Sequence, residues 1–124
     1  MKTGIVVFAH GSRVESANEA VRAVAAELAG LGGYELVEAA FLELAEPDLK
    51  GAIERLVGLG AERVVVIPYF LTLGRHAAQD LPALVGEIEA AHPGLSVVVT
   101  APLDGHTAMS RILLDRAREG LRDA

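Results

Sequence analysis

Four short apolar runs, separated by helical patterns, constrain the fold more than any other feature of this sequence. The runs are GIVVFA, YELVEAAF, RVVVIPYF and LSVVVTA, at residues 4–9, 34–41, 63–70 and 95–101. Three of them are rich in valine and isoleucine with almost no alternation, which is typical of strands buried on both faces of a parallel sheet. The run at 34–41 alternates more and is predicted to lie at an edge of that sheet.

Apolar residues at three- and four-residue spacing predict a helix after each strand. The four helical patterns lie in residues 15–33, 46–60, 80–94 and 107–121. Glycines end the first two helices. The start of the third helix stays open, because Pro82 fits either its first turn or the interior of a longer helix.

The order of these elements predicts an α/β fold in a single domain of residues 1–124. We expect a four-stranded, mostly parallel sheet with strand order 2-1-3-4, right-handed crossovers and helices on both faces. That strand order places a topological switch between the first and third strands. Ligands of open α/β sheets bind there, outside the carboxyl ends of the strands.

Composition excludes several classes of function. The chain contains no cysteine, which removes disulfides, thiolate metal sites and cysteine nucleophiles. A net charge of −6 argues against a nucleic-acid partner, since phosphate binding needs a basic face. The first apolar run, about five residues long, is too short for a signal peptide or a membrane span. The chain is therefore predicted to be cytoplasmic, without a membrane partner.

Histidines stand beside arginines just past two of the predicted strands. His10 and Arg13 follow the first strand, and Arg75 and His76 follow the third, which the predicted order makes its neighbour. Glu43 follows the second strand. Two neutral imidazoles and a carboxylate can hold a divalent transition metal with positions left open, or the imidazoles can act as general bases. The arginines suit a substrate that carries carboxylates or phosphates.

Structural roles for the same residues stay open. Each strand-end histidine can also be a hydrogen-bonded structural residue, and Glu43 a solvated acid. His92 is expected at a helix C-terminus, and His106 either at a helix start or in the cleft. Ser12 lacks the G-x-S-x-G context of a nucleophile, and the sequence contains neither a G-x-G-x-x-G after a strand nor a Walker A motif.

Three blocks of sequence, VVFAHGSR, FLELAEPDL and VVVIPYFLTLGRHAAQDLP, resemble the short-form sirohydrochlorin chelatases. These are the CbiX-type class II chelatases of cobalamin and siroheme biosynthesis. The resemblance covers nearly the whole chain and implies a chelatase-like fold. It implies a sirohydrochlorin cobaltochelatase that inserts Co²⁺ into the tetrapyrrole without ATP, with Fe²⁺ and Ni²⁺ as alternative metals. The metal is then a substrate, no cofactor is permanently bound, and two chains pair as a homodimer.

The resemblance also implies roles for particular residues. His10 and His76 would bind the metal and carry the catalysis, with His10 as proton acceptor and Glu43 in the same metal site. Substrate contacts map onto Glu46 and onto a segment made of Leu71, Thr72, Leu73, Gly74, Arg75 and His76. We add Arg13 and Arg75 as partners for the carboxylates of sirohydrochlorin. The apolar PYFLTLG loop is expected to pack on the face of the macrocycle.

Composition gives independent support for pairing. Hydrophobic residues make up 52% of the chain, which is high for a small monomer that must cover its own surface. Two other functions compete with the chelatase. One is a carrier that binds metal or tetrapyrrole without turnover, and the other is a hydrolase that uses His10 as its base.

Overall fold

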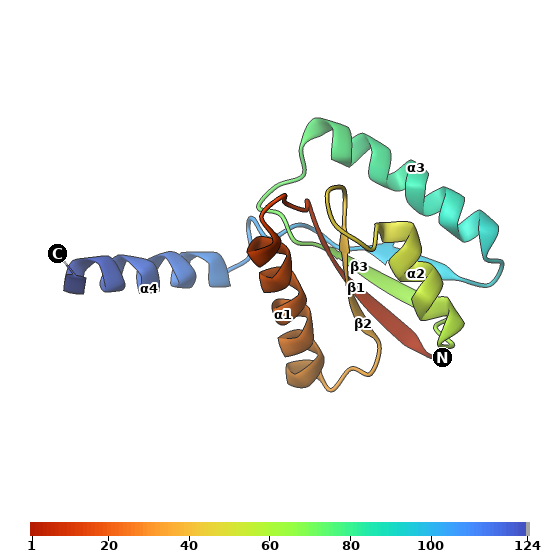
Figure 1. The fold of residues 1–124 in the computed structure, drawn as a ribbon, viewed down its shortest axis with the longest axis horizontal. Coiled ribbons are helices and arrows are strands. Elements are labelled where there is room, and N and C mark those ends of the chain that lie inside the picture. Colours follow the sequence, from red (N-terminus) through yellow and green to blue (C-terminus); the bar gives the residue numbers. More distant parts are fainter. Residues whose placement is uncertain (124) are drawn as a thin grey trace.

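The computed structural model describes residues 1–123, in which four strands alternate with four helices (Figure 1). All three strand pairs are parallel and the sheet order is β2-β1-β3-β4, so the predicted fold class and strand order are confirmed. The elements are β1 (Thr3–Ala9), α1 (Glu15–Gly32), β2 (Val37–Phe41), α2 (Leu49–Gly58), β3 (Arg63–Pro68), α3 (Arg75–Ala91), β4 (Ser96–Val99) and α4 (Ala108–Asp123).

The element boundaries refine the sequence predictions. Strands β2, β3 and β4 are each shorter than the apolar runs that predict them. Helix α3 begins at Arg75, so Pro82 lies inside the helix rather than in its first turn. An interior proline removes one backbone hydrogen bond, and the buried Leu81, Val85 and Ile88 anchor the helix on both sides of it.

One face of the sheet is fully covered. Helices α2 and α3 pack on it and form the larger core with inward-facing residues of all four strands. The helix residues buried in this core are Leu49, Ala52, Ile53, Leu56, Leu81, Val85 and Ile88. Burial on this scale provides most of the driving force for folding.

The opposite face is covered only in part. Helix α1 packs on β1 and β2, where Ala25 joins Val7, Ala9, Ala39 and Phe41 in a second, smaller core. Helix α4 covers neither face: it projects away from the body of the protein (Figure 1), and none of its described residues is buried. The prediction of helices on both faces is confirmed by α1, α2 and α3, whereas α4 departs from it.

Because all strands are parallel, the segments that follow them gather at the carboxyl edge of the sheet. These are residues 10–14, 42–48, 69–74 and 100–107. The topological switch lies between β1 and β3, as predicted from the strand order. In residues 1–123, no helix has the length and apolar character needed to cross a membrane.

Candidate active site

The residues directly after β1 and β2 form a histidine–carboxylate pair. Strand register places Ala9 opposite Phe41, so the residues that follow them stay side by side. The Nε2 atom of His10 lies 3.1 Å from Oε1 of Glu43, and the backbone N–H of Glu43 donates to the His10 carbonyl. Each of the two side chains is 58% exposed. The pair is therefore fixed by the backbone and remains open to a ligand.

This geometry leaves the pair with two chemical uses. In the tautomer in which Nε2 of His10 donates to the Glu43 carboxylate, Nδ1 keeps a lone pair that can accept a proton. Alternatively, a metal ion can displace the Nε2 proton. Neighbouring ligands on one ion, each about 2.1 Å from it, lie on the order of 3 Å apart, as Nε2 and Oε1 do. The pair can thus accept a proton or hold a metal.

The loop after β1 tolerates little change in its backbone. Gly11 has φ +93°, in the left-handed region that favours glycine, and a Cβ there would overlap the carbonyl oxygen of Glu43. The ring of Phe70 meets the His10 ring edge to face, with centroids 6.3 Å apart. His10 is thus held between the loop after β2 and the start of the loop after β3.

Asn18 fixes the other end of this loop, and sequence reasoning missed it. Asn18 is 1% exposed and makes two hydrogen bonds to the backbone of Ser12. Its Oδ1 accepts from the Ser12 N–H at 2.9 Å, and its Nδ2 donates to the Ser12 carbonyl at 2.8 Å. The Ser12 hydroxyl accepts from the Val14 N–H, which gives that serine a structural role. The sequence does carry a signal for this role, because Asn18 is a polar residue on the apolar face of the helix that follows HGS.

His76 stands apart from the pair. It lies in the first turn of α3, where its side chain is exposed, and most of the segment from Leu71 to His76 is exposed as well. Within residues 1–123, no three histidine, aspartate or glutamate side chains lie close enough together to hold a metal ion. The structure thus joins His10 to Glu43 and leaves His76 outside, so a metal site of all three residues stays a prediction.

Apolar side chains rim the pair on both sides. Leu42 and Leu44 from the loop after β2 are 43% and 53% exposed, and Leu71 from the loop after β3 is 63% exposed. Sequence reasoning anticipated the second loop only. Beside Glu43, residues 44–48 and Gly51 line an open hollow of about 650 Å³. These features suit a large, flat, partly apolar ligand.

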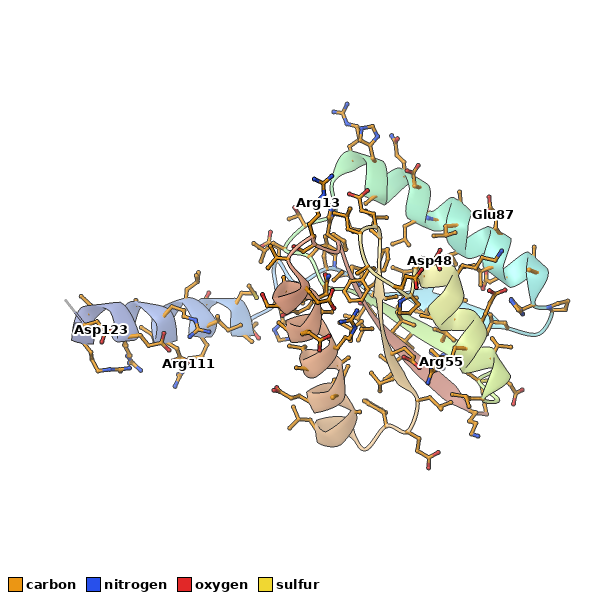
Figure 2. The ribbon with its side chains drawn as sticks, viewed as in Figure 1. Arg13, Asp48, Arg55, Glu87, Arg111 and Asp123 are labelled. Atoms are coloured by element: carbon orange, nitrogen blue, oxygen red, sulfur yellow. The ribbon has the colours of Figure 1, made fainter. Side chains whose placement is uncertain are left out.

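The residues predicted as polar contacts to the substrate are all exposed. The side chain of Glu46 is exposed, and its carbonyl accepts from Arg22 Nη2 at 3.3 Å. Arg13 and Arg75 are also exposed. Figure 2 shows Arg13 at the same end of the molecule as the loop that leads into α3. Exposed arginines are free to pair with carboxylates of a ligand.

The remaining histidines have structural positions. Nδ1 of His106 accepts from the Ala108 N–H at 3.0 Å, so this side chain caps the start of α4. His92 ends α3, as predicted, with its Nε2 atom 3.6 Å from Oε2 of Glu54. Of the two placements left open for His106, the structure supports the helix start.

Charges on α1 tie that helix to the end of β2. Arg22 donates to Glu15 and Glu19 at 2.7 Å each, and its guanidinium lies 5.2 Å from the centre of the Phe41 ring. The hydrogen bond from Arg22, aided by one from Asn18, holds the pKa of Glu15 below its ordinary value. The network anchors the helix that carries Asn18.

A parallel α/β sheet with a histidine–carboxylate pair and an apolar rim at its carboxyl edge defines a small ligand-binding or catalytic domain of the open-sheet class. The family model CbiX matches residues 4–120 of the chain. The chain belongs to the CbiX family.

Two similar proteins are sirohydrochlorin chelatases. The chloroplastic sirohydrochlorin ferrochelatase of Arabidopsis thaliana is 38% identical over 118 residues, covering 95% of this chain and 52% of the relative. The chain thus spans about half the length of that relative. The sirohydrochlorin cobaltochelatase of Methanopyrus kandleri is 28% identical, and the match covers 94% of this chain and 96% of the relative.

Solved structures agree in fold. A putative cobalamin biosynthesis CbiX protein from Marinobacter aquaeolei superposes with a TM-score of 0.85 at 30% identity, covering 98% of this chain and 99% of that one. The sirohydrochlorin chelatase SirB from Bacillus subtilis subspecies spizizenii, solved in complex with cobalt, gives a TM-score of 0.88 at 26% identity. That match covers 96% of this chain and 51% of SirB.

Proposed function

We propose that this CbiX-family chain is a sirohydrochlorin cobaltochelatase, which inserts Co²⁺ into sirohydrochlorin without ATP. The observation that carries the proposal is the His10–Glu43 pair, 3.1 Å apart and exposed at the carboxyl edge of the sheet. The apolar rim of the pair suits the face of a macrocycle. The family of the chain and its chelatase relatives support the same reaction.

The chemistry of metal insertion matches the pair. Two pyrrole N–H groups lose their protons while one Co²⁺ enters the ring, so each turnover yields the metallated tetrapyrrole and two protons. The free Nδ1 lone pair of His10 serves as the first proton acceptor, and Glu43 stabilises the imidazolium that forms. The exposed pair passes the proton on to water.

His76 acts with the pair when the substrates are bound. We assign it to the metal, together with His10 and Glu43, and we assign Glu46 and the segment Leu71–His76 to the tetrapyrrole. Arg13 and Arg75 pair with its carboxylates. A site with only nitrogen and oxygen ligands holds Co²⁺ loosely enough to release it to the macrocycle.

Cobalt is the proposed metal because cobaltochelatases recur among the relatives, that of Methanopyrus kandleri among them, and because SirB was solved in complex with cobalt. The higher identity to the ferrochelatase, 38% against 28%, favours iron as the second candidate. Imidazole and carboxylate ligands suit both ions.

The proposal includes the assembly of two copies into a homodimer. A macrocycle needs walls on more than one side, and the rim around His10 is open to solvent. The apolar surface that the chain leaves exposed supports this pairing.

The experiment compares initial rates of insertion of Co²⁺, Fe²⁺ and Ni²⁺ into sirohydrochlorin, followed anaerobically by absorbance of the tetrapyrrole. The protein is present at a small fraction of the tetrapyrrole concentration, and the reaction without protein is the control. We expect many turnovers per chain above the uncatalysed rate, fastest with Co²⁺. Binding of tetrapyrrole or metal without turnover would identify a carrier instead. A higher rate with Fe²⁺ than with Co²⁺ would identify iron as the preferred metal substrate.

A further inference from the structure

Helix α3 consists of two parts that are held to the protein very differently. From Leu81 onward, Leu81, Val85 and Ile88 are buried in the larger core. Before that point, residues 75–80 include no buried side chain, and Ala77 alone among them is half-buried. Figure 1 shows this start of α3 standing away from the sheet, at the end of the loop from β3. Packing therefore anchors the body of the helix and leaves its first turns without an anchor.

The backbone adds no anchor to these first turns. Leu73 is half-buried against the larger core. Gly74 follows it as the N-cap of α3 and makes no side-chain hydrogen bond. Among residues 1–123, no backbone hydrogen bond joins residues 74–80 to another element. We call residues 74–80 the arm, because the chain is held on either side of this segment, at Leu73 and Leu81, and not within it.

An apolar hollow separates the arm from the edge of the sheet. It has a volume of about 390 Å³, and its lining includes Ala78 of the arm, Pro82, and Val99 of β4. The arm is therefore not packed down on the strand beside it. A change in the position of the arm would break no close apolar packing on this side.

Pro82 is the position at which α3 bends most easily. Its nitrogen carries no hydrogen, so the carbonyl of Ala78 loses its usual helical partner, and the proline ring clashes with that carbonyl in a straight helix. Helix kinks of more than about 20° usually occur at proline. His76 lies one and a half turns before Pro82, which is roughly 9 Å along the helix axis. A modest bend at Pro82 therefore displaces His76 by a few ångströms.

We propose that Pro82 is a positioning residue for metal insertion, about which the arm bends to bring His76 to the His10–Glu43 pair. The proposal rests on the proposed function, which assigns His76 to the metal. It reconciles that assignment with the exposed position of His76, apart from the pair. A metal ion that binds all three side chains favours the bent form, and the population of that form sets the apparent affinity for the metal.

The first test compares two replacements of Pro82 that both restore the backbone N–H. Pro82→Ala gives a continuous, stiffer helix, whereas Pro82→Gly gives a helix that still bends. Pro82→Ala should raise the Kd for Co²⁺ about threefold or more by calorimetry, and the KM for Co²⁺ with it, while resistance to urea increases. Pro82→Gly should stay closer to the native Kd. Pro93→Ala, just beyond the other end of α3, is the control and should leave the Kd unchanged.

A double-mutant cycle shows whether Pro82 acts through His76. In a His76→Ala background the arm carries no metal ligand, so adding Pro82→Ala should change the Kd for Co²⁺ no further. An equal effect of Pro82→Ala in both backgrounds would overturn the proposal, because Pro82 would then support the fold rather than the position of His76.

The second test measures the movement of the arm. The chain has no cysteine, so nitroxide spin labels can be attached at Gln79→Cys in the arm and Lys50→Cys on α2, both at exposed positions. Zn²⁺ is diamagnetic and also binds imidazole and carboxylate, and its addition should shift the distance between the labels. Labels at Lys50→Cys and Glu87→Cys should show no shift, because Glu87 lies on the anchored part of α3 (Figure 2). His76→Ala should abolish the shift at Gln79→Cys.

The outcomes separate the arm from the proposed function. A label distance that stays unchanged on addition of Zn²⁺ overturns the arm, whether or not Zn²⁺ binds, and the insertion assay still decides the function. A shift in a protein that inserts no metal supports the arm and overturns the chelatase. A shift combined with a native Kd for Co²⁺ in Pro82→Ala overturns the assignment of the bend to Pro82.

Discussion

The loops after β1 and β3 both carry a histidine to the carboxyl edge of the sheet, yet they are built differently. The loop after β1 is held by Asn18, by the backbone of Glu43 and by the ring of Phe70. The loop after β3 ends at Gly74, an N-cap without a side-chain hydrogen bond, and the exposed His76 lies in the first turn of the helix that follows. For the proposed site we therefore expect one preorganised side and one side that substrate binding completes.

The largest effect is expected on the rate of cobalt insertion when either His10 or His76 is replaced. His10→Ala removes the proton acceptor and a metal ligand, so the rate of cobalt insertion should fall about a hundredfold or more. We expect His76→Ala to lower it by a similar factor, with more of the loss recovered at high Co²⁺. The measurement is the insertion rate across a range of cobalt concentrations, with His92→Ala as the control. Wild-type rates for both variants would show that the site is assigned wrongly.

The second effect compares one glycine from each loop. Gly11→Ala puts a Cβ against the Glu43 carbonyl at φ +93°, and the unfolding free energy should drop by about 2 kcal/mol or more. Gly74→Ala meets nothing within 4 Å, and its change should stay within about 0.5 kcal/mol. Urea unfolding of the two variants checks this. Equal losses would mean that the two loops are equally constrained.

The third effect isolates Asn18 as a positioning residue. Asn18→Ala leaves the N–H and carbonyl of the half-buried Ser12 without their partner, which should cost about 1–3 kcal/mol in unfolding free energy. Because His10 lies two residues before Ser12, kcat should fall while KM for cobalt changes less. Gln79→Ala, at an exposed position early in α3, is the control. A variant that loses stability but keeps kcat would limit Asn18 to a structural role.

The smallest effect is a pH dependence at the anchor of α1. Arg22 lowers the pKa of Glu15 from its ordinary value of 4.5, so the charged form stabilises the folded state. This stability is fully present above pH 4.5 and is lost as the pH falls through the lowered pKa. Glu15→Gln should therefore flatten the decline of unfolding free energy below that pH. Arg22→Gln should remove the same dependence, and an unchanged acid limb in both variants would contradict the assignment.

Individual residues of the candidate site show which contacts could be predicted from the sequence and which could not. His10 and Glu43 could be paired from the sequence, because strand order and parallel register make the ends of β1 and β2 neighbours. Asn18 could not be found this way, since its partners are backbone atoms of a loop whose shape depends on Gly11. Leu42 and Leu44 also escaped notice, because their exposure depends on how the chain turns between β2 and α2.

The sequence by itself determined the α/β class, the parallel sheet, its strand order and the edge at which the candidate site is proposed. These follow from apolar periodicity and from chirality rules that act within a few residues or on adjacent elements. Only the tertiary structure decided that Pro82 lies inside α3, that His76 stands apart from His10, and that α4 leaves the sheet. An amphipathic pattern predicts that one face of a helix packs against an apolar surface. Which surface this is depends on packing between residues far apart in the sequence.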